Sequence, residues 1–88
     1  MAKGITTYIR VADDNKSDDG KRYRTYNVFN RADDTCIGHV FETFTTHEMD
    51  YKSNRESLAY SLVNGKRVNG ANTRARTVAM LRDAYMSA

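Results

Sequence analysis

The segment "RYRTYNVFNRADDTCIGHVFETFTT", residues 22–46, contains two runs of strand-forming side chains separated by a short polar link. Residues 22–30 and 36–46 are rich in aromatic and β-branched types, which favour a pleated, half-buried backbone. The link between them, "RADDT", carries the aspartates typical of a turn. The segment therefore predicts a β-hairpin and an antiparallel sheet built around it.

The residues before this hairpin predict one more strand. In "ITTYIRV", residues 5–11, β-branched side chains recur at every second position, which indicates one buried face. The following "ADDNKSDDGK", residues 12–21, is predicted to be a turn because Asp, Asn, Ser and Gly favour turn conformations. Three strands joined by short polar links predict an antiparallel meander.

The second half of the chain predicts two helices. Apolar residues from Leu58 to Val63 have helical spacing, and two capping-box patterns precede them, so this helix begins near Thr46 or near Ser53. Asn64-Gly65 supplies a left-handed stop, and "KRV" after it is either a loop or a very short strand. The last helix is predicted to start near Asn72 or Thr73, with Ala75, Val78, Leu81 and Tyr85 forming its apolar stripe.

These elements together predict one α+β domain over residues 1–88. Its order is β-β-β-α-α, a three-stranded antiparallel β-meander followed by two α-helices packed on one face of the sheet. The predicted core comprises Ile9, Val28, Val40, Leu58, Leu62, Val78 and Leu81, with Phe41 and Phe44 added from the third strand.

Composition places the chain among ordinary globular proteins. Of its 88 residues, 40% are hydrophobic and 28% are charged. No apolar run approaches the roughly 20 residues needed to cross a bilayer, so no membrane association is expected. The first ten residues lack the apolar segment of a signal peptide, and the single cysteine, Cys36, suits a reducing compartment. We therefore expect a cytoplasmic protein, in the host cell's cytoplasm if a phage encodes it.

No motif in the chain indicates catalysis. Cys36 and His39 make at most half of a zinc site, and His47-Glu48 lacks the second histidine of a metalloprotease motif. Gly65 and Gly70 have the glycine spacing of a phosphate loop, but Ala71 and Asn72 stand where Lys and Ser or Thr are required. We expect no enzyme activity, no cofactor and no metal site.

Charge divides the chain into two unequal halves. Residues 1–50 hold seven Lys or Arg and nine Asp or Glu, whereas residues 51–88 hold seven and two. The acidic turn residues are candidate contacts for a basic protein surface: Asp13, Asp14, Asp18, Asp19, Asp33 and Asp34. The basic residues of the second half are candidate contacts for an anion or a nucleic acid, in part because arginines near a helix start oppose its dipole: Lys66, Arg67, Arg74, Arg76 and Arg82.

Basic and aromatic residues also alternate within the predicted strands. Tyr8 and Arg10, Arg24 and Tyr26, and His39 with Phe41 are predicted to share one face of the meander. Such interleaving suits nucleic acid, through phosphate contacts and base stacking. Tyr8, Arg10 and Arg24 are therefore further candidate partner-binding residues.

The strand order, with "GKRYRTYNV" (residues 20–28) after a turn, resembles the small DNA-binding domains at the front of phage integrases. That resemblance covers residues 5–63 and implies a three-stranded sheet placed in the major groove. More generally the chain resembles the short accessory proteins of tailed bacteriophages, including anti-defence inhibitors of the anti-CRISPR type. This second resemblance implies an inhibitor that docks on a protein.

Two functional classes follow from these patterns. In the first, the chain is a non-catalytic, phage-type inhibitor that docks on a host protein or complex that handles nucleic acid, with its acidic turns mimicking nucleic-acid charge. In the second, it is a small basic module that binds nucleic acid through its sheet or a helix N-terminus. The acidic turns favour the first class, because a nucleic-acid binder must keep them away from phosphate. The oligomeric state stays open.

Overall fold

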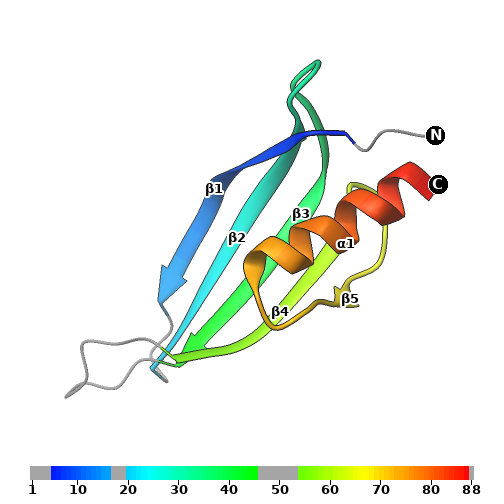
Figure 1. Ribbon diagram of the computed structural model, residues 1–88. Helices are drawn as coiled ribbons and strands as arrows, with labels where there is room; N and C mark the ends of the chain where they lie inside the picture. The colour runs from blue at the N-terminus through cyan, green and yellow to red at the C-terminus, as the bar shows by residue number, and fades with distance from the viewer. Residues whose placement is uncertain (1–4, 17–19, 46–53, 88) are drawn as a thin grey trace.

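The computed structural model contains one five-stranded antiparallel sheet and one helix (Figure 1). It describes residues 5–16, 20–45 and 54–87, except for the side chains of residues 45 and 54–56. The elements are β1 (Thr7–Lys16), β2 (Lys21–Asn30), β3 (Thr35–Thr45), β4 (Asn54–Leu62), β5 (Val68–Asn69) and α1 (Arg74–Ser87). The strands lie in chain order, so each strand pairs with its neighbour in sequence.

The predicted central hairpin is confirmed. β2 and β3 pair antiparallel, and the turn between them closes with a hydrogen bond of 2.7 Å from the Asp34 N–H to the Asn30 carbonyl. Asp34 has a φ of 59°, a left-handed conformation that Asp adopts more readily than most residues. β1 is longer than predicted, because the strand continues through a bulge between Val11 and Asp13 as far as Lys16.

The second half of the chain corrects the predicted fold. Residues 54–62 form β4 and not a helix, so the expected three-stranded meander with two helices is wrong, although the α+β class holds. Leu58, Tyr60 and Leu62 alternate, and pairing with β3 places all three on one face, which outweighs the helical spacing read from Ala59, Leu62 and Val63. The part of the predicted helix start over residues 46–53 lies outside the described residues.

The sheet then ends on a very short strand, one of the two alternatives for "KRV". β5 pairs with β4 through Tyr60↔Val68 and Ala59↔Asn69. Before it, Gly65 closes a turn by donating its N–H to the Leu62 carbonyl at 3.0 Å. Gly65 does not have a positive φ, so the predicted left-handed stop at this glycine is also wrong. The resemblance to integrase domains, which covers residues 5–63, implied three strands. Because β4 is a fourth strand within those residues, that resemblance is weakened.

The predicted start of the last helix is confirmed. Thr73 caps α1, because its hydroxyl accepts a hydrogen bond of 3.2 Å from the N–H of Arg76. Thr77 is fully buried one turn later, where its hydroxyl donates to the Thr73 carbonyl and accepts from the Ala71 N–H. A Cβ on Gly70 would lie 2.6 Å from Thr77 Cγ2, so this close approach requires glycine.

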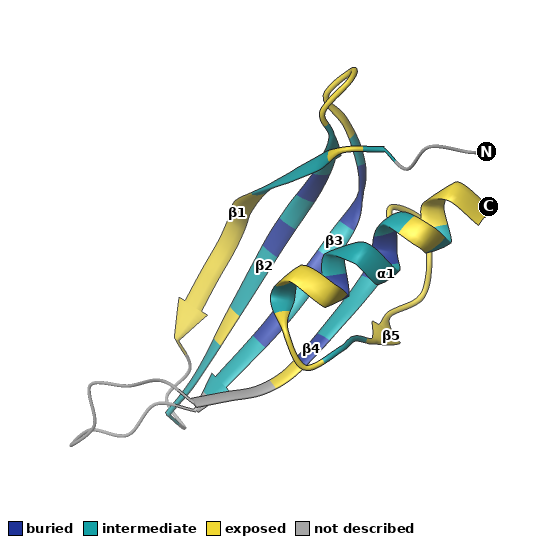
Figure 2. Cartoon of the chain, in the orientation of Figure 1, coloured by how far each residue is buried: buried dark blue, intermediate teal, exposed yellow. Residues whose placement is uncertain are grey.

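α1 packs against β3 and β4 and covers one face of the sheet, which we call the covered face (Figure 1). Gly38 on β3 makes this contact close: a Cβ there would lie 2.7 Å from Leu81 Cδ1 and 2.3 Å from the Ser61 carbonyl oxygen. The opposite side of the sheet, which carries no helix of the described part of the chain, we call the open face. The buried residues follow β2, β3, β4 and the first three turns of α1, while much of β1 is exposed (Figure 2).

The core prediction is largely confirmed. Val28, Val40, Leu58 and Leu81 are buried, and Ile9, Leu62 and Val78 pack against them half-buried. Tyr26 and Ile37 complete the core, and three polar residues are also buried: Glu42, Ser61 and Thr77. The prediction was wrong for Phe41 and Phe44, which are only half-buried. Phe41 pairs with Thr25 on the open face, where none of the described elements forms a second layer over it.

Candidate nucleic-acid interface

Strand register gathers rings and polar side chains on the open face. Residues directly opposite each other in an antiparallel pair project to the same side. Since Val28 and Val40 belong to the covered face, their strand neighbours project to the other side. Three cross-strand rows result: Tyr8 beside Phe29, Arg10 beside Asn27 and His39, and Thr25 beside Phe41.

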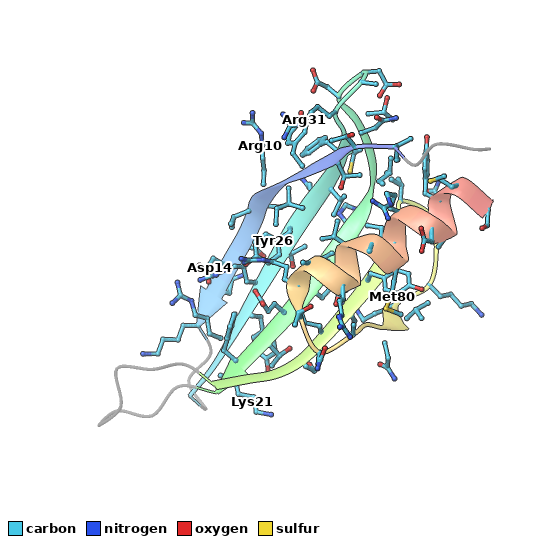
Figure 3. The ribbon with its side chains drawn as sticks, viewed as in Figure 1. Arg10, Asp14, Lys21, Tyr26, Arg31 and Met80 are labelled. Atoms are coloured by element: carbon cyan, nitrogen blue, oxygen red, sulfur yellow. The ribbon has the colours of Figure 1, made fainter. Side chains whose placement is uncertain are left out.

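The first ring pair, Tyr8 and Phe29, is a stacked platform. The ring centroids are 5.1 Å apart and the planes differ by 20°. The guanidinium carbons of Arg10 and Arg31 lie 5.7 Å and 5.2 Å from the Tyr8 centroid, and both side chains sit at the same end of β1 (Figure 3). The Tyr8 hydroxyl donates to Asp34 Oδ1 at 2.6 Å, which raises the pKa of Tyr8 and keeps the phenol protonated.

The second platform lies farther along the sheet, where Arg67 covers Phe41. The guanidinium carbon of Arg67 is 3.9 Å from the Phe41 ring centroid. Arg67 comes from the segment between β4 and β5, and the residue of β4 directly opposite Phe41 is the small Ala59, so nothing bulky separates the two side chains there. His39 flanks the same ring at 6.2 Å between centroids. Cation–π pairs of this kind contribute about 0.5–2 kcal/mol.

A hydrogen-bonded pair, Asn27 and His39, lies between the two platforms. His39 Nδ1 is 2.8 Å from Asn27 Oδ1. Because a carboxamide oxygen only accepts, Nδ1 carries the proton and Nε2 keeps its lone pair in the neutral ring. The pair thus offers an amide N–H₂ and a ring nitrogen, both of which form hydrogen bonds with base edges.

The shared-face prediction is correct for Tyr8, Arg10, His39 and Phe41 and wrong for Arg24 and Tyr26. Tyr26 is 3% exposed and pairs with Val40 on the covered face, on the side of the sheet that bears α1 (Figure 3). Its hydroxyl donates to Glu42 Oε1 at 2.8 Å and accepts from Arg24 Nη1 at 3.2 Å. This hydrogen bond to Tyr26 is the main reason why the pKa of Arg24 is raised.

Arg74 also belongs to this buried network. Its Nη1 donates to the Tyr26 hydroxyl at 2.6 Å and lies 4.0 Å from Glu42 Oε1, while the guanidinium group lies over the Tyr26 ring. The negative group that Arg74 meets at the helix start is therefore Glu42, which is 1% exposed. This internal carboxylate offsets the unfavourable position of an arginine in the first turn.

The other basic candidates are dispersed. Lys66 and Arg76 are exposed, Arg82 is half-buried on α1 beside Asp83, and only Arg67 reaches the open face. The structure therefore does not gather these residues into one anion site.

Acidic candidates are engaged within the chain. Asp14 lies on β1 and accepts two hydrogen bonds of 2.7 Å from Arg22, which lowers the pKa of Asp14. Asp33 accepts from the Thr35 N–H, and hydrogen bonds from Thr35 lower the pKa of Asp33. Asp13 accepts from Asn15 Nδ2 at 2.6 Å. Asp18 and Asp19 lie outside the described residues.

Sequence reasoning missed Asn27, Phe29 and Arg31 as members of the open face. The signal was present in part, because strict alternation along residues 22–30 separates Phe29 and Asn27 from Val28. Arg31 follows β2 and contacts Tyr8 on the adjacent strand β1, 23 residues earlier in the sequence, so no local pattern indicates the contact.

Over the described ranges, no three His, Cys, Asp or Glu side chains are grouped closely enough to hold a metal ion. None of the helical segments in those ranges has the length and apolar character to span a bilayer. The chain matches no family profile, no curated protein and no solved structure, so the assignment of a function depends on the open face itself.

Proposed function

We propose that the open face binds single-stranded nucleic acid. The observation that carries the proposal is the pair of ring platforms, Tyr8–Phe29 and Phe41, each accompanied by guanidinium groups on a face that no helix covers. Unpaired bases stack on aromatic rings and on arginine planes, and the same guanidinium groups attract phosphate.

The spacing of the platforms suits a short strand. Phe41 lies opposite Thr25, which is four residues from Phe29 along β2, so the platforms are about 13 Å apart along the strand direction. The Asn27–His39 pair occupies the interval, where it can contact the edge of a base held between the platforms. A duplex offers no free base faces to these rings, so single strands are the preferred ligand.

This proposal takes up the sheet variant of the nucleic-acid class. The helix N-terminus variant loses support because Arg74 meets Glu42 of the same chain. The phage-type inhibitor that docks on a host protein through acidic turns loses support because Asp14 and Asp34 are engaged by Arg22 and Tyr8. The proposed function is binding without catalysis, in the cytoplasm, where a free Cys36 thiol is stable.

Fluorescence anisotropy with a labelled single strand of about 12 nucleotides tests the proposal. The Arg67→Met variant is expected to weaken binding about five- to 150-fold, the equivalent of ~1–3 kcal/mol for one stacked base. Arg76→Met removes the same charge from the exposed side of α1 and serves as the matched control, with a change of less than about twofold. Affinity is expected to fall as the salt concentration is raised from about 50 mM to about 200 mM, because phosphate contacts release counterions.

Three results would contradict the proposal. They are the absence of single-strand binding by the wild type at low salt, equal losses in the Arg67 and Arg76 variants, and tighter binding of the matching duplex than of either of its strands. The last of these would indicate phosphate contact without base stacking.

A further inference from the structure

A groove of about 640 Å³ runs between β1 and α1 on the covered face. It exists because α1 packs on β3 and β4 and leaves the β1 side of the sheet uncovered (Figure 1). Four apolar side chains form much of its lining: Ile9, Ala75, Val78 and Ala79. Tyr8 of the proposed nucleic-acid interface also belongs to the lining of this groove, whereas the arginines that line it, Arg74 and Arg82, take no part in that interface.

Two arginines on α1, Arg74 and Arg82, line the same groove. Arg74 contacts Tyr26 and Glu42 through Nη1, but 43% of its side chain stays exposed and accessible to a further carboxylate. They are eight residues apart, which places their Cα atoms about 12 Å apart along the helix. Arg82 Nε is buried and has no hydrogen-bond partner among the described residues, although Oδ1 of the largely exposed Asp83 lies 3.8 Å away. No acidic residue belongs to the groove lining, so an occupant with negative groups would complement it.

The third wall of the groove is the edge strand of the sheet. Among the described strands, β1 pairs with β2 alone, so its other edge presents unpaired backbone N–H and C=O groups. A strand added at that edge would direct every second side chain toward the groove. Side chains at i and i+4 of such a strand are about 13 Å apart, close to the 12 Å between Arg74 and Arg82.

We propose that the groove is a docking site for an extended acidic segment of a protein partner. The segment pairs with β1 through its backbone, places carboxylates at i and i+4 against Arg82 and Arg74, and buries an apolar side chain at i+2 against Val78. Backbone pairing supplies affinity, while the two arginines and the apolar lining set the sequence that is accepted. An extended peptide is favoured over a nucleic acid because a peptide backbone repeats N–H and C=O groups at the spacing of the edge strand, which a nucleic acid does not.

A designed nonapeptide serves as the probe. It carries glutamate at its third and seventh positions, valine at its fifth and threonine elsewhere, with blocked ends and a fluorescein label. The matched control peptide has the same composition but places its second glutamate at the sixth position, which turns that carboxylate to the other side of the strand. Anisotropy is expected to show binding of the first peptide at least about tenfold tighter than of the second.

Variants locate the binding on the groove. Arg82→Met is expected to weaken the probe about tenfold, whereas Arg76→Met, which removes the same charge from outside the groove, leaves it unchanged. Circular dichroism melting establishes that both variants remain folded. A Val78→Ala variant, which keeps both arginines, is expected to weaken the probe as well, through loss of the apolar contact.

Four outcomes would overturn the proposal. Equal binding of the two peptides would show that spacing does not matter, and equal losses in the Arg82 and Arg76 variants would show that only net charge does. Displacement of the probe by a single-stranded oligonucleotide would assign the groove to nucleic acid. Sedimentation of the wild type as a dimer that Arg82→Met dissociates would make a second copy of the chain the occupant.

Discussion

The two faces of one sheet use the same strands for different purposes. Val28 and Val40 project to the covered face, where they are fully buried under α1, while their neighbours Phe29 and Phe41 project to the open face and stay half-buried. Charged groups differ in the same way. Glu42 is buried on the covered face, where its Oε1 accepts a hydrogen bond from Tyr26, whereas Arg67 lies over an aromatic ring on the open face. Burial thus selects aliphatic side chains and a few hydrogen-bonded polar groups for stability, and the open face keeps rings and cations that a ligand can contact.

The largest expected difference between the faces is in packing. Leu81→Ala removes a fully buried side chain that meets Gly38, and we expect it to lower the free energy of unfolding by about 2–5 kcal/mol. Phe41→Leu on the open face is expected to cost less than about 1.5 kcal/mol, because the volume change is small and the site is half-solvated. Urea unfolding followed by far-UV circular dichroism measures both. Equal losses in the two variants would mean that the open face is also a core.

The removal of a single hydroxyl group from each face is expected to have an effect of intermediate size on stability. Tyr26→Phe removes the buried hydroxyl that donates to Glu42 and accepts from Arg74, and is expected to cost about 1–3 kcal/mol because the carboxylate loses a donor. Tyr8→Phe removes the same atom from the open face, where it donates to the exposed Asp34, and should change stability by no more than about 0.5 kcal/mol. The same urea unfolding curves report both values. A smaller cost for Tyr26→Phe than for Tyr8→Phe would contradict the buried network.

The smallest effect concerns the exposed ion pair at the end of β1. Arg22 lowers the pKa of Asp14 below its ordinary value of 3.8, so the pair stabilises the folded chain above that pH and loses this contribution as the pH falls through the lowered pKa. Asp14→Asn should therefore reduce the melting temperature slightly at pH 7, with the difference from wild type disappearing as the pH falls through the lowered pKa of Asp14. Asp13→Asn removes the same charge one residue earlier, where no ion pair is present among the described residues, and its profile should follow the wild type more closely. A difference between Asp14→Asn and wild type that grows on acidification would reverse the sign of this linkage.

The candidate site was only partly accessible to sequence reasoning. Alternation placed Tyr8, Arg10, His39 and Phe41 on one face, because the side chains of a strand point alternately to opposite sides whatever the neighbours are. The same rule does not give the register between strands, so Arg24 and Tyr26 were grouped with Tyr8, although Phe29 is the residue opposite Tyr8. Arg67 meets Phe41, and Arg74 meets Tyr26, across more than 25 residues of sequence. Contacts at that separation depend on the packed fold and leave no local pattern.

The sequence by itself determined the elements whose signals are local. Three features depend on residues close in sequence, and all three were predicted. They are the turn at 31–34, the strands on either side of it and the Thr73 cap of α1. Only the tertiary structure decided residues 57–62, because "SLAYSL" fits a helix by the spacing of Ala59 and Leu62 and a strand by the alternation of Leu58, Tyr60 and Leu62. The unpaired edge of β3 supplied hydrogen bonds, and the core supplied burial for all three large side chains at once. A strand satisfies both, whereas a helix would leave that edge of β3 without a partner.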